Sequence, residues 1–412
     1  MNISKLLLLF SFCYLVNQLT IAQEKPKKAL FIIVDGIAAD VLERVTTPYM
    51  DMISEEGAYT RAYLGGEKGG YSETPTISAV GYNSLLTGTW ANKHNVWDND
   101  IEAPNYHYWT IFRFFKTQYP EKKTAVFSTW LDNRTKLIGE GLAATGNLRM
   151  DHSFDGLELD TINFPHNDPF YIQKIDEKVT AQAVATLKEE GPDLTWVYLQ
   201  FTDNTGHDYG DSPKNDRAVE IIDRQVGEIY ASVKYREQYY DEDWLVFVTT
   251  DHGRKAVDGK GHGGQSEREK TIWIVTSLKK PNRYFYASQP AIVDLLPSLA
   301  DHLQIDIPTE QRMELDGITL LKDISISHPE AYVQGNELVV SWEPHQSNER
   351  VKVWIAQTNQ FNTSGQADDY QLAGEVDILE KRFVYPLKKK GSFYKVVIEG
   401  NYNMVNRWVN AD

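Results

Sequence analysis

The chain contains almost no cysteine. Its single cysteine, Cys13, lies in an apolar run near the N-terminus. One thiol cannot build a disulfide framework within the chain, nor a metal site made of several thiolates. Any metal ion that the protein binds must therefore be held by histidine and carboxylate side chains.

Basic residues are also under-represented. The 412 residues include 42 Lys and Arg against 58 Asp and Glu, which gives a formal net charge of −16. Nucleic-acid polymers and anionic membranes are captured by basic surfaces, so we expect neither as a main partner. A small phosphorylated substrate remains compatible with this acidity, because bound metal ions reverse the local field.

Long apolar runs are confined to the start of the chain, where one extends from Leu6 to Val16. It follows Lys5 and precedes the small residues before a polar stretch that begins at Gln23. This pattern is typical of a secretory signal peptide, and the run is too short to span a bilayer. We predict that residues 1–22 are a signal peptide and that the mature protein has no integral membrane segment. It is then exported, either to the periplasm or out of the cell.

Two alternatives apply to the same segment. A buried N-terminal helix is disfavoured, because the run has no amphipathic pattern. A lipid anchor on Cys13 is disfavoured as well, because the preceding Phe12 is too bulky for the usual lipidation motif.

Apolar strands alternate with helical patterns from Ala29 onward. The predicted strands are 30–34, 124–127, 195–201, 244–248 and 272–275. Near-continuous apolar strands separated by helices imply an α/β domain with a mostly parallel sheet and helices on both faces. We assign residues 23–323 to this α/β domain.

Short strands without helices follow from about Ile324. They are predicted at 338–342, 351–355, 382–385, 393–398 and 406–409. This spacing predicts a small C-terminal β-sandwich over residues 324–412, which resembles a fibronectin type III module. We expect an independent core, so that a chain ending after about Lys322 stays folded.

Six acidic or imidazole side chains lie at or beyond the carboxyl ends of the predicted strands: Asp35, Asp203, His207, Asp251, His252 and His262. In open α/β sheets ligands bind at this edge. Zinc takes Asp and His in sites that keep one position open for catalysis. A single Asp or His at such a position is more often a helix cap or a structural residue. The prediction of a metal site therefore depends on the convergence of all six residues at one edge. Glycines near these residues are expected to allow sharp turns.

Four segments, namely 34–36, 202–207, 250–253 and 261–263, resemble in order and spacing the metal-binding motifs of the alkaline phosphatase superfamily. The similarity is greatest to its type I phosphodiesterase/nucleotide pyrophosphatase branch and covers about residues 28–322. It implies two Zn²⁺ ions per chain, for which other divalent metals could substitute. The implied ligands are Asp203, His207 and His262 for one ion, and Asp35, Asp251, His252 and the nucleophile for the other.

The superfamily nucleophile starts a helix that ends, in this branch, in a Thr-Gly pair, and it lies ten residues before that glycine. Counting back from Gly88 reaches Ser78. A hydroxyl at a helix N-terminus and beside zinc would be stabilised as its alkoxide. Thr76 is the alternative nucleophile, and a plain helix cap is the structural alternative for Ser78.

The chain departs from the branch pattern after the nucleophile. An Asn that contacts the phosphoryl group usually stands three residues on, where Gly81 is found here. Asn83 would then have to replace it, and Tyr82 and Asn99 are further candidates for substrate contact. The aromatic residues Tyr82, Trp90, Trp97 and Tyr106 could also stack on a base or sugar, although most are expected in the core.

The resulting prediction is a hydrolase that cleaves phosphodiester or pyrophosphate bonds through a phosphoryl-enzyme intermediate on Ser78. The substrate would be small and phosphorylated, linked to a nucleotide or a sugar. A phosphomonoesterase is the alternative. A sulfatase is less favoured, because Val80 and Tyr82 stand where sulfatases carry Pro or Ala and then Arg. A non-catalytic, metal-stabilised binding protein is the alternative outside enzymes.

Overall fold

The computed structural model describes residues 24–411. The predicted signal peptide and Cys13 lie outside the described residues. Within residues 24–411, no helix is both long enough and apolar enough to cross a membrane.

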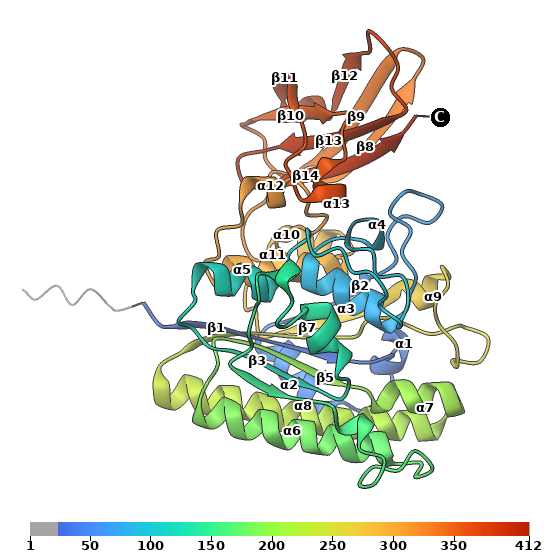
Figure 1. Ribbon diagram of the computed structural model, residues 1–412, viewed down its shortest axis with the longest axis vertical. Coiled ribbons are helices and arrows are strands. Elements are labelled where there is room, and N and C mark those ends of the chain that lie inside the picture. The colour runs from blue at the N-terminus through green and yellow to red at the C-terminus, as the bar shows by residue number, and fades with distance from the viewer. Residues whose placement is uncertain (1–23, 412) are drawn as a thin grey trace, which may run out of the picture.

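A seven-stranded sheet forms the centre of the larger part of the molecule, in the order β2-β7-β6-β1-β5-β3-β4 (Figure 1). β1 pairs in parallel with β5 and β6, whereas β7 is antiparallel to both of its neighbours. The predicted, mostly parallel sheet is therefore confirmed. Its strands are β1 (Lys27–Val34), β2 (Ala58–Tyr63), β3 (Thr124–Ser128), β4 (His152–Phe154), β5 (Leu194–Leu199), β6 (Asp243–Thr249) and β7 (Thr271–Thr276).

Helices cover both faces of this sheet, because successive side chains of a strand point to opposite faces. Ala29, Phe31 and Ile33 pack with α3, α5 and α11, whereas the alternate residues of β1 pack with α2, α6 and α8. The helices are α1 (Ala39–Leu42), α2 (Pro48–Glu56), α3 (Ser78–Thr87), α4 (Ala91–His94), α5 (Ile111–Gln118), α6 (Tyr171–Glu189), α7 (Phe201–Tyr209), α8 (Pro213–Tyr240), α9 (Glu267–Lys270), α10 (Arg283–Ala287), α11 (Leu295–His302), α12 (Thr309–Arg312) and α13 (Gln360–Ser364).

Two antiparallel sheets form the C-terminal part, in the orders β11-β10-β13-β14 and β12-β9-β8. The small β-sandwich of the predicted fold class is thus present. The boundary at residue 324 and the likeness to a fibronectin type III module stay predictions. The strands are β8 (Ile326–Gln334), β9 (Glu337–Pro344), β10 (Arg350–Ala356), β11 (Gln371–Asp377), β12 (Arg382–Pro386), β13 (Phe393–Glu399) and β14 (Met404–Asn410).

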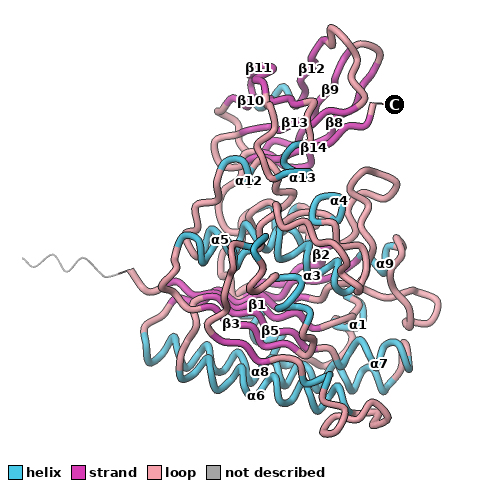
Figure 2. Tube along the Cα trace, in the orientation of Figure 1, coloured by secondary structure: helices cyan, strands magenta, loops and turns pink. Residues whose placement is uncertain are grey.

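The sandwich rests on the α3 and α11 side of the larger part (Figures 1 and 2). Val340, Trp342 and Val396 of the sandwich belong to the same continuous apolar cluster as Leu85 of α3 and Leu296 of α11. The expected independent core is therefore not observed, because the two parts bury their apolar surfaces against each other.

The carboxyl ends of the three central strands meet at one edge of the sheet. β1 ends one residue before Asp35, and β6 ends two residues before Asp251. β5 ends at Leu199, two residues earlier than predicted. The reason is the carboxylate of Asp176, which accepts hydrogen bonds from the N–H groups of Gln200 and Phe201 and so starts α7.

Candidate metal centre

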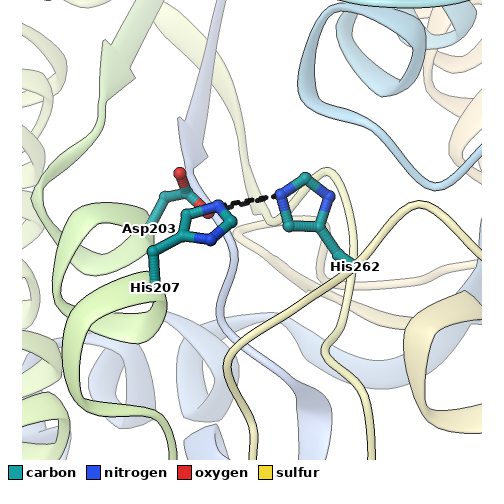
Figure 3. Close-up of side chains that lie close together, drawn as sticks. All are labelled: Asp203, His207 and His262. Atoms are coloured by element: carbon teal, nitrogen blue, oxygen red, sulfur yellow. Dashed lines mark hydrogen bonds and ion pairs between the residues drawn. The ribbon is translucent and has the colours of Figure 1, made fainter.

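Three predicted ligands come together in one group at this edge (Figure 3). Asp203 and His207 lie one turn apart in α7 and so share a helix face. His262, on the loop before α9, faces them, with its Nε2 atom 3.0 Å from Nε2 of His207. Oδ1 of Asp203 lies 3.4 Å from the His207 Nε2 and 3.9 Å from the His262 Nε2. Three donor atoms thus surround one point.

A second group lies directly beside the first and is fully buried. Nε2 of His252 is 3.4 Å from Oδ1 of Asp35 and 3.2 Å from Oδ2 of Asp251. The ring of His252 stacks on that of His262 with 3.7 Å between centroids. Asp203 also lies within reach of Asp35 and His252, so the two groups adjoin. The structure therefore brings all six predicted ligands together.

Two carboxylate oxygens of the second group show that it suits a cation. Oδ1 of Asp35 and Oδ2 of Asp251 are buried and have no hydrogen-bond partner among residues 24–411. A buried acceptor without a partner is costly, and a metal ion is one partner that satisfies it. Imidazole and carboxylate donors are also the ligands that zinc prefers. The residues present therefore fit a metal ion.

The electrostatics of the centre follow from burial and from mutual repulsion. Burial raises the pKa of Asp35, and the nearby carboxylates of Asp251 and Asp203 raise it further. Burial lowers the pKa of His252 and of His262. Both imidazoles are therefore neutral at pH 7, which is the form that binds a metal. A cation between the groups would favour the ionised carboxylates.

Ser78 lies beside His252, the residue of the second group whose ring stacks on His262 of the first group. It is the first residue of α3, and its Oγ is 3.3 Å from Nε2 of His252. The N-cap position belongs to Ile77, whose side chain makes no capping hydrogen bond. A plain capping role for Ser78 is therefore excluded. The hydroxyl lies at the positive end of the α3 dipole, which would stabilise a negative charge on it.

Thr76, the alternative nucleophile, has its hydroxyl engaged elsewhere. Its Oγ1 donates to the carbonyl of Gly264 at 2.8 Å and accepts from the N–H of Gly263 at 2.9 Å. Its carbonyl oxygen lies 2.9 Å from Nδ1 of His262. Thr76 therefore holds the loop that carries His262.

The three predicted substrate contacts differ in their positions. Tyr82 is fully buried, and its hydroxyl donates to Oδ2 of Asp35, so its ring cannot reach a substrate. This correction arises because position 82 of α3 points into the core. Asn83 is 3% exposed. Asn99 is exposed, and its Oδ1 accepts from the N–H of Ala79 at 3.0 Å, which places it beside Ser78.

Of the other aromatic candidates, Trp90 is buried and stacks on Tyr63, whereas Trp97 is 43% exposed. The hydroxyl of Tyr106 donates to the carbonyl of Lys136 at 2.6 Å. Trp97 therefore keeps an exposed ring on the segment that carries Asn99.

The sequence did not reveal two residues that orient the candidate ligands. The hydroxyl of Tyr198 donates to Oδ2 of Asp35 at 2.6 Å. Arg254 is buried and donates to the carboxylate of Asp203 and, at 2.9 Å, to the carbonyl of Gly36. Arg254 stands two residues after His252, so its place in the motif was a usable signal, whereas Tyr198 resembles any apolar strand residue.

The family comparison agrees with this geometry. The family model described as type I phosphodiesterase/nucleotide pyrophosphatase matches residues 29–385. The chain belongs to this family. Type I phosphodiesterases and nucleotide pyrophosphatases are hydrolases of phosphoester bonds, and the match extends into the C-terminal sheets.

The individual relatives and solved structures that resemble this chain share little of its sequence. Ectonucleotide pyrophosphatase/phosphodiesterase family member 7 of Rattus norvegicus is 24% identical over 330 residues, which are 77% of this chain and 66% of that protein. The chain thus spans just under two thirds of that relative. The structure of Ps i-CgsB is 16% identical, with a TM-score of 0.51 and 87% of each chain covered. Human ectonucleotide pyrophosphatase/phosphodiesterase 5 is 14% identical, with a TM-score of 0.48 and coverage of 68% of this chain and 96% of that one.

Helix α3 passes very close to the Asp251 segment at Gly81. A Cβ atom at position 81 would lie 2.8 Å from the carbonyl oxygen of Asp251 and 3.0 Å from its Cβ. Helix α3 therefore approaches the Asp251 segment too closely for a side chain at position 81 to fit without a shift.

Proposed function

We propose that this chain is a metal-dependent hydrolase that cleaves phosphodiester or pyrophosphate bonds, with Ser78 as its nucleophile. One observation carries the proposal. The Ser78 hydroxyl lies at the start of a helix, 3.3 Å from His252, where the two groups of carboxylates and imidazoles adjoin. A positioned hydroxyl beside ligands for two cations is the arrangement that nucleophilic catalysis on phosphorus requires.

The proposed metal content is two Zn²⁺ ions. Asp203, His207 and His262 would hold one ion, and Asp35, Asp251 and His252 would hold the other. When bound, such ions activate a nucleophile and stabilise the charge on a leaving oxygen. Other divalent metals that accept imidazole and carboxylate ligands could substitute.

The reaction would proceed in two displacements. The oxygen of Ser78 attacks phosphorus, the bond to the leaving oxygen breaks, and water then attacks the same phosphorus and releases Ser78. Two inversions retain the configuration at phosphorus. Tyr82 and Tyr198 fix the carboxylate of Asp35 during these steps, and Arg254 fixes that of Asp203.

Asn99 is the proposed contact to the phosphoryl group. Its amide oxygen already accepts a hydrogen bond from Ala79, so its NH₂ group is left to donate to an anionic oxygen. The substrate class proposed is a small phosphodiester or pyrophosphate linked to a nucleotide or a sugar. The Arg254 guanidinium donates to Asp203 and to backbone carbonyls. It is therefore not free to bind the two negative charges of a phosphomonoester, which favours the diester.

Export through a cleaved signal peptide, to the periplasm or out of the cell, is part of the same proposal. It is supported by the sequence pattern of residues 1–22. N-terminal sequencing of the mature protein from its native cells should begin at Gln23.

The test is a comparison of three nitrophenyl substrates, a phosphodiester, a phosphomonoester and a sulfate ester, with one zinc-loaded preparation. We expect the highest kcat/KM for the diester and loss of turnover with a chelator. A higher kcat/KM for the monoester would make the chain a monoesterase. Absence of turnover on all three would identify a binding protein.

A further inference from the structure

Strand β14 of the sandwich contacts the chain on both sides of the nucleophile helix. Three consecutive residues of β14 make these contacts, namely Asn406, Arg407 and Trp408. β14 lies on the side of the sandwich that faces the larger part (Figure 1). The contacts on the two sides of α3 differ in chemistry.

The segment after α3 is held through a buried lysine. Lys93 is fully buried, and its ammonium donates to Oδ1 of Asp316 at 2.6 Å, to Oδ1 of Asn406 at 2.7 Å and to the carbonyl of Glu314 at 2.8 Å. A buried ammonium needs all of its acceptors, because an unpaired buried charge is very costly. The sandwich supplies one of the three through Asn406.

Asp316 connects Lys93 to the end of α3. Its backbone N–H donates to the carbonyl of Gly88, which follows the last residue of α3, at 2.9 Å. Its carboxylate also accepts from the N–H of Trp90 at 3.0 Å. The NH₂ group of Asn406 donates to the neighbouring carbonyl of Leu315. Asn406 therefore anchors both the lysine and the segment that closes the helix.

The segment before α3 is held by aromatic and ionic contacts. The Tyr71 ring stacks on that of Trp408 with 5.9 Å between centroids, and the Arg407 guanidinium lies 5.0 Å from the centre of the Tyr71 ring. Arg407 also pairs with Glu67. Residues 64–77 lead directly into Ser78, so β14 restrains the chain upstream of the nucleophile as well.

We propose that β14 positions the nucleophile, and that the sandwich is therefore part of the support of the active site. This inference rests on the proposed function of Ser78. Helix α3 is ten residues long and buried throughout, so a displacement at its end is carried to its first residue. A misplacement of about 1 Å costs on the order of a hundredfold in rate. Asn406 is thus a positioning residue that acts through Lys93 and Asp316.

The test compares Asn406→Leu with Asn403→Leu, a matched change in the same module. Asn403 makes three hydrogen bonds, at 2.8 to 3.1 Å, to residues 325 and 326 of the sandwich. We expect Asn406→Leu to lower kcat at least about tenfold, with KM and zinc content within about twofold of wild type. Asn403→Leu should lower the melting temperature to a similar degree and leave kcat unchanged. Asn406→Asp, which keeps an acceptor for Lys93 but loses the donor to the Leu315 carbonyl, should recover only part of the lost kcat.

Hydrogen exchange supplies a readout that does not depend on turnover. We expect faster exchange in residues 64–94 of Asn406→Leu but not of Asn403→Leu, with β1 and β5 unchanged in both. Equal kcat values for the two leucine variants, or equal exchange in residues 64–94, would overturn the proposal. A wild-type protein that hydrolyses no ester would instead contradict the proposed function, and the exchange comparison would still test whether Asn406 holds α3.

Discussion

At the scale of single residues, the glycines of the metal-binding motifs serve the packing of Arg254. A Cβ atom at Gly36 or at Gly206 would lie 2.3 Å from the guanidinium of Arg254. The sequence predicted sharp turns at glycines near the ligands, and Gly263, with φ +105°, meets that expectation. Gly206 lies within α7, so the space for Arg254 explains it. Sequence patterns identify a required glycine more readily than the side chain that requires it.

This packing gives a prediction for Gly206→Ala. Alanine has a higher helix propensity than glycine, so propensity alone would make this change stabilise α7. We expect it instead to push Arg254 away from Asp203 and to weaken zinc binding at least about tenfold. Zinc titration with a competing chelator measures this. Asp208→Ala, an exposed change in the same helix, is the control and should leave zinc affinity unchanged.

The nucleophile gives a second prediction at this scale. Ser78→Ala should reduce kcat by at least about a thousandfold, while zinc content stays near two per chain, because the serine supplies only one contact at an open position. Thr76→Val should weaken zinc binding, since Thr76 holds the His262 loop. An inactive Thr76→Val with full zinc, together with an active Ser78→Ala, would show that the nucleophile had been assigned to the wrong hydroxyl.

At the scale of elements, the start of α7 determines where two ligands lie. Asp176 of α6 accepts hydrogen bonds from the hydroxyl of Thr129 and from two N–H groups at the start of α7. In the same way, the carboxylate of Asp223 in α8 accepts hydrogen bonds from the N–H groups of Tyr49 and Met50 at the start of α2. The sequence did not predict these capping contacts, because each comes from a distant helix.

We therefore expect Asp176→Ala to lower the free energy of unfolding by about 3 kcal/mol, because it leaves buried N–H groups without an acceptor. It should also weaken zinc binding by displacing Asp203 and His207. Asp223→Ala should cost a similar amount of stability without affecting zinc affinity. Chemical denaturation and zinc titration of both variants test this, and equal zinc affinities in the two would contradict the expectation.

The same carboxyl group gives a pH dependence. Burial raises the pKa of Asp176 to about 7, above its unfolded value of about 4. The folded state then binds the proton more tightly, so the stability contributed by Asp176 is complete below pH 4 and is lost as pH rises through 7. The stability difference between wild type and Asp176→Ala should therefore be larger at pH 5 than at pH 8. Denaturation at the two pH values would show the reverse order if the folded pKa were depressed.

At the scale of the whole molecule, the α/β architecture and the convergence of the six candidate ligands followed from the sequence because both depend on local patterns. Apolar runs predicted the central strands, and the residues after them predicted which side chains meet at the sheet edge. The relation between the two parts of the chain did not follow, because it depends on contacts between distant residues. Lys395 of β13 is buried against Glu314 and Asp368, and each of these residues looks like a surface charge in the sequence.

These contacts change the expectation for a truncated chain. Removing the residues after Lys322 would expose apolar residues of the shared cluster and would leave Lys93 with two of its three acceptors. We now expect this truncation to lower stability by more than about 5 kcal/mol and to yield aggregated or inactive protein. A soluble, zinc-loaded truncated chain with normal rates on a small diester would contradict this expectation.

The position of β14 in the chain also fixes the order in which the catalytic unit can be completed. Every proposed ligand lies before residue 263, and Ser78 precedes Asp316 and the β14 residues that hold the end of α3. The ribosome adds Asn406, Arg407 and Trp408 more than three hundred residues after Ser78. The nascent chain therefore carries the complete set of reactive groups long before they can be aligned. From the proposed role of β14 we therefore expect full activity only after synthesis has passed residue 408.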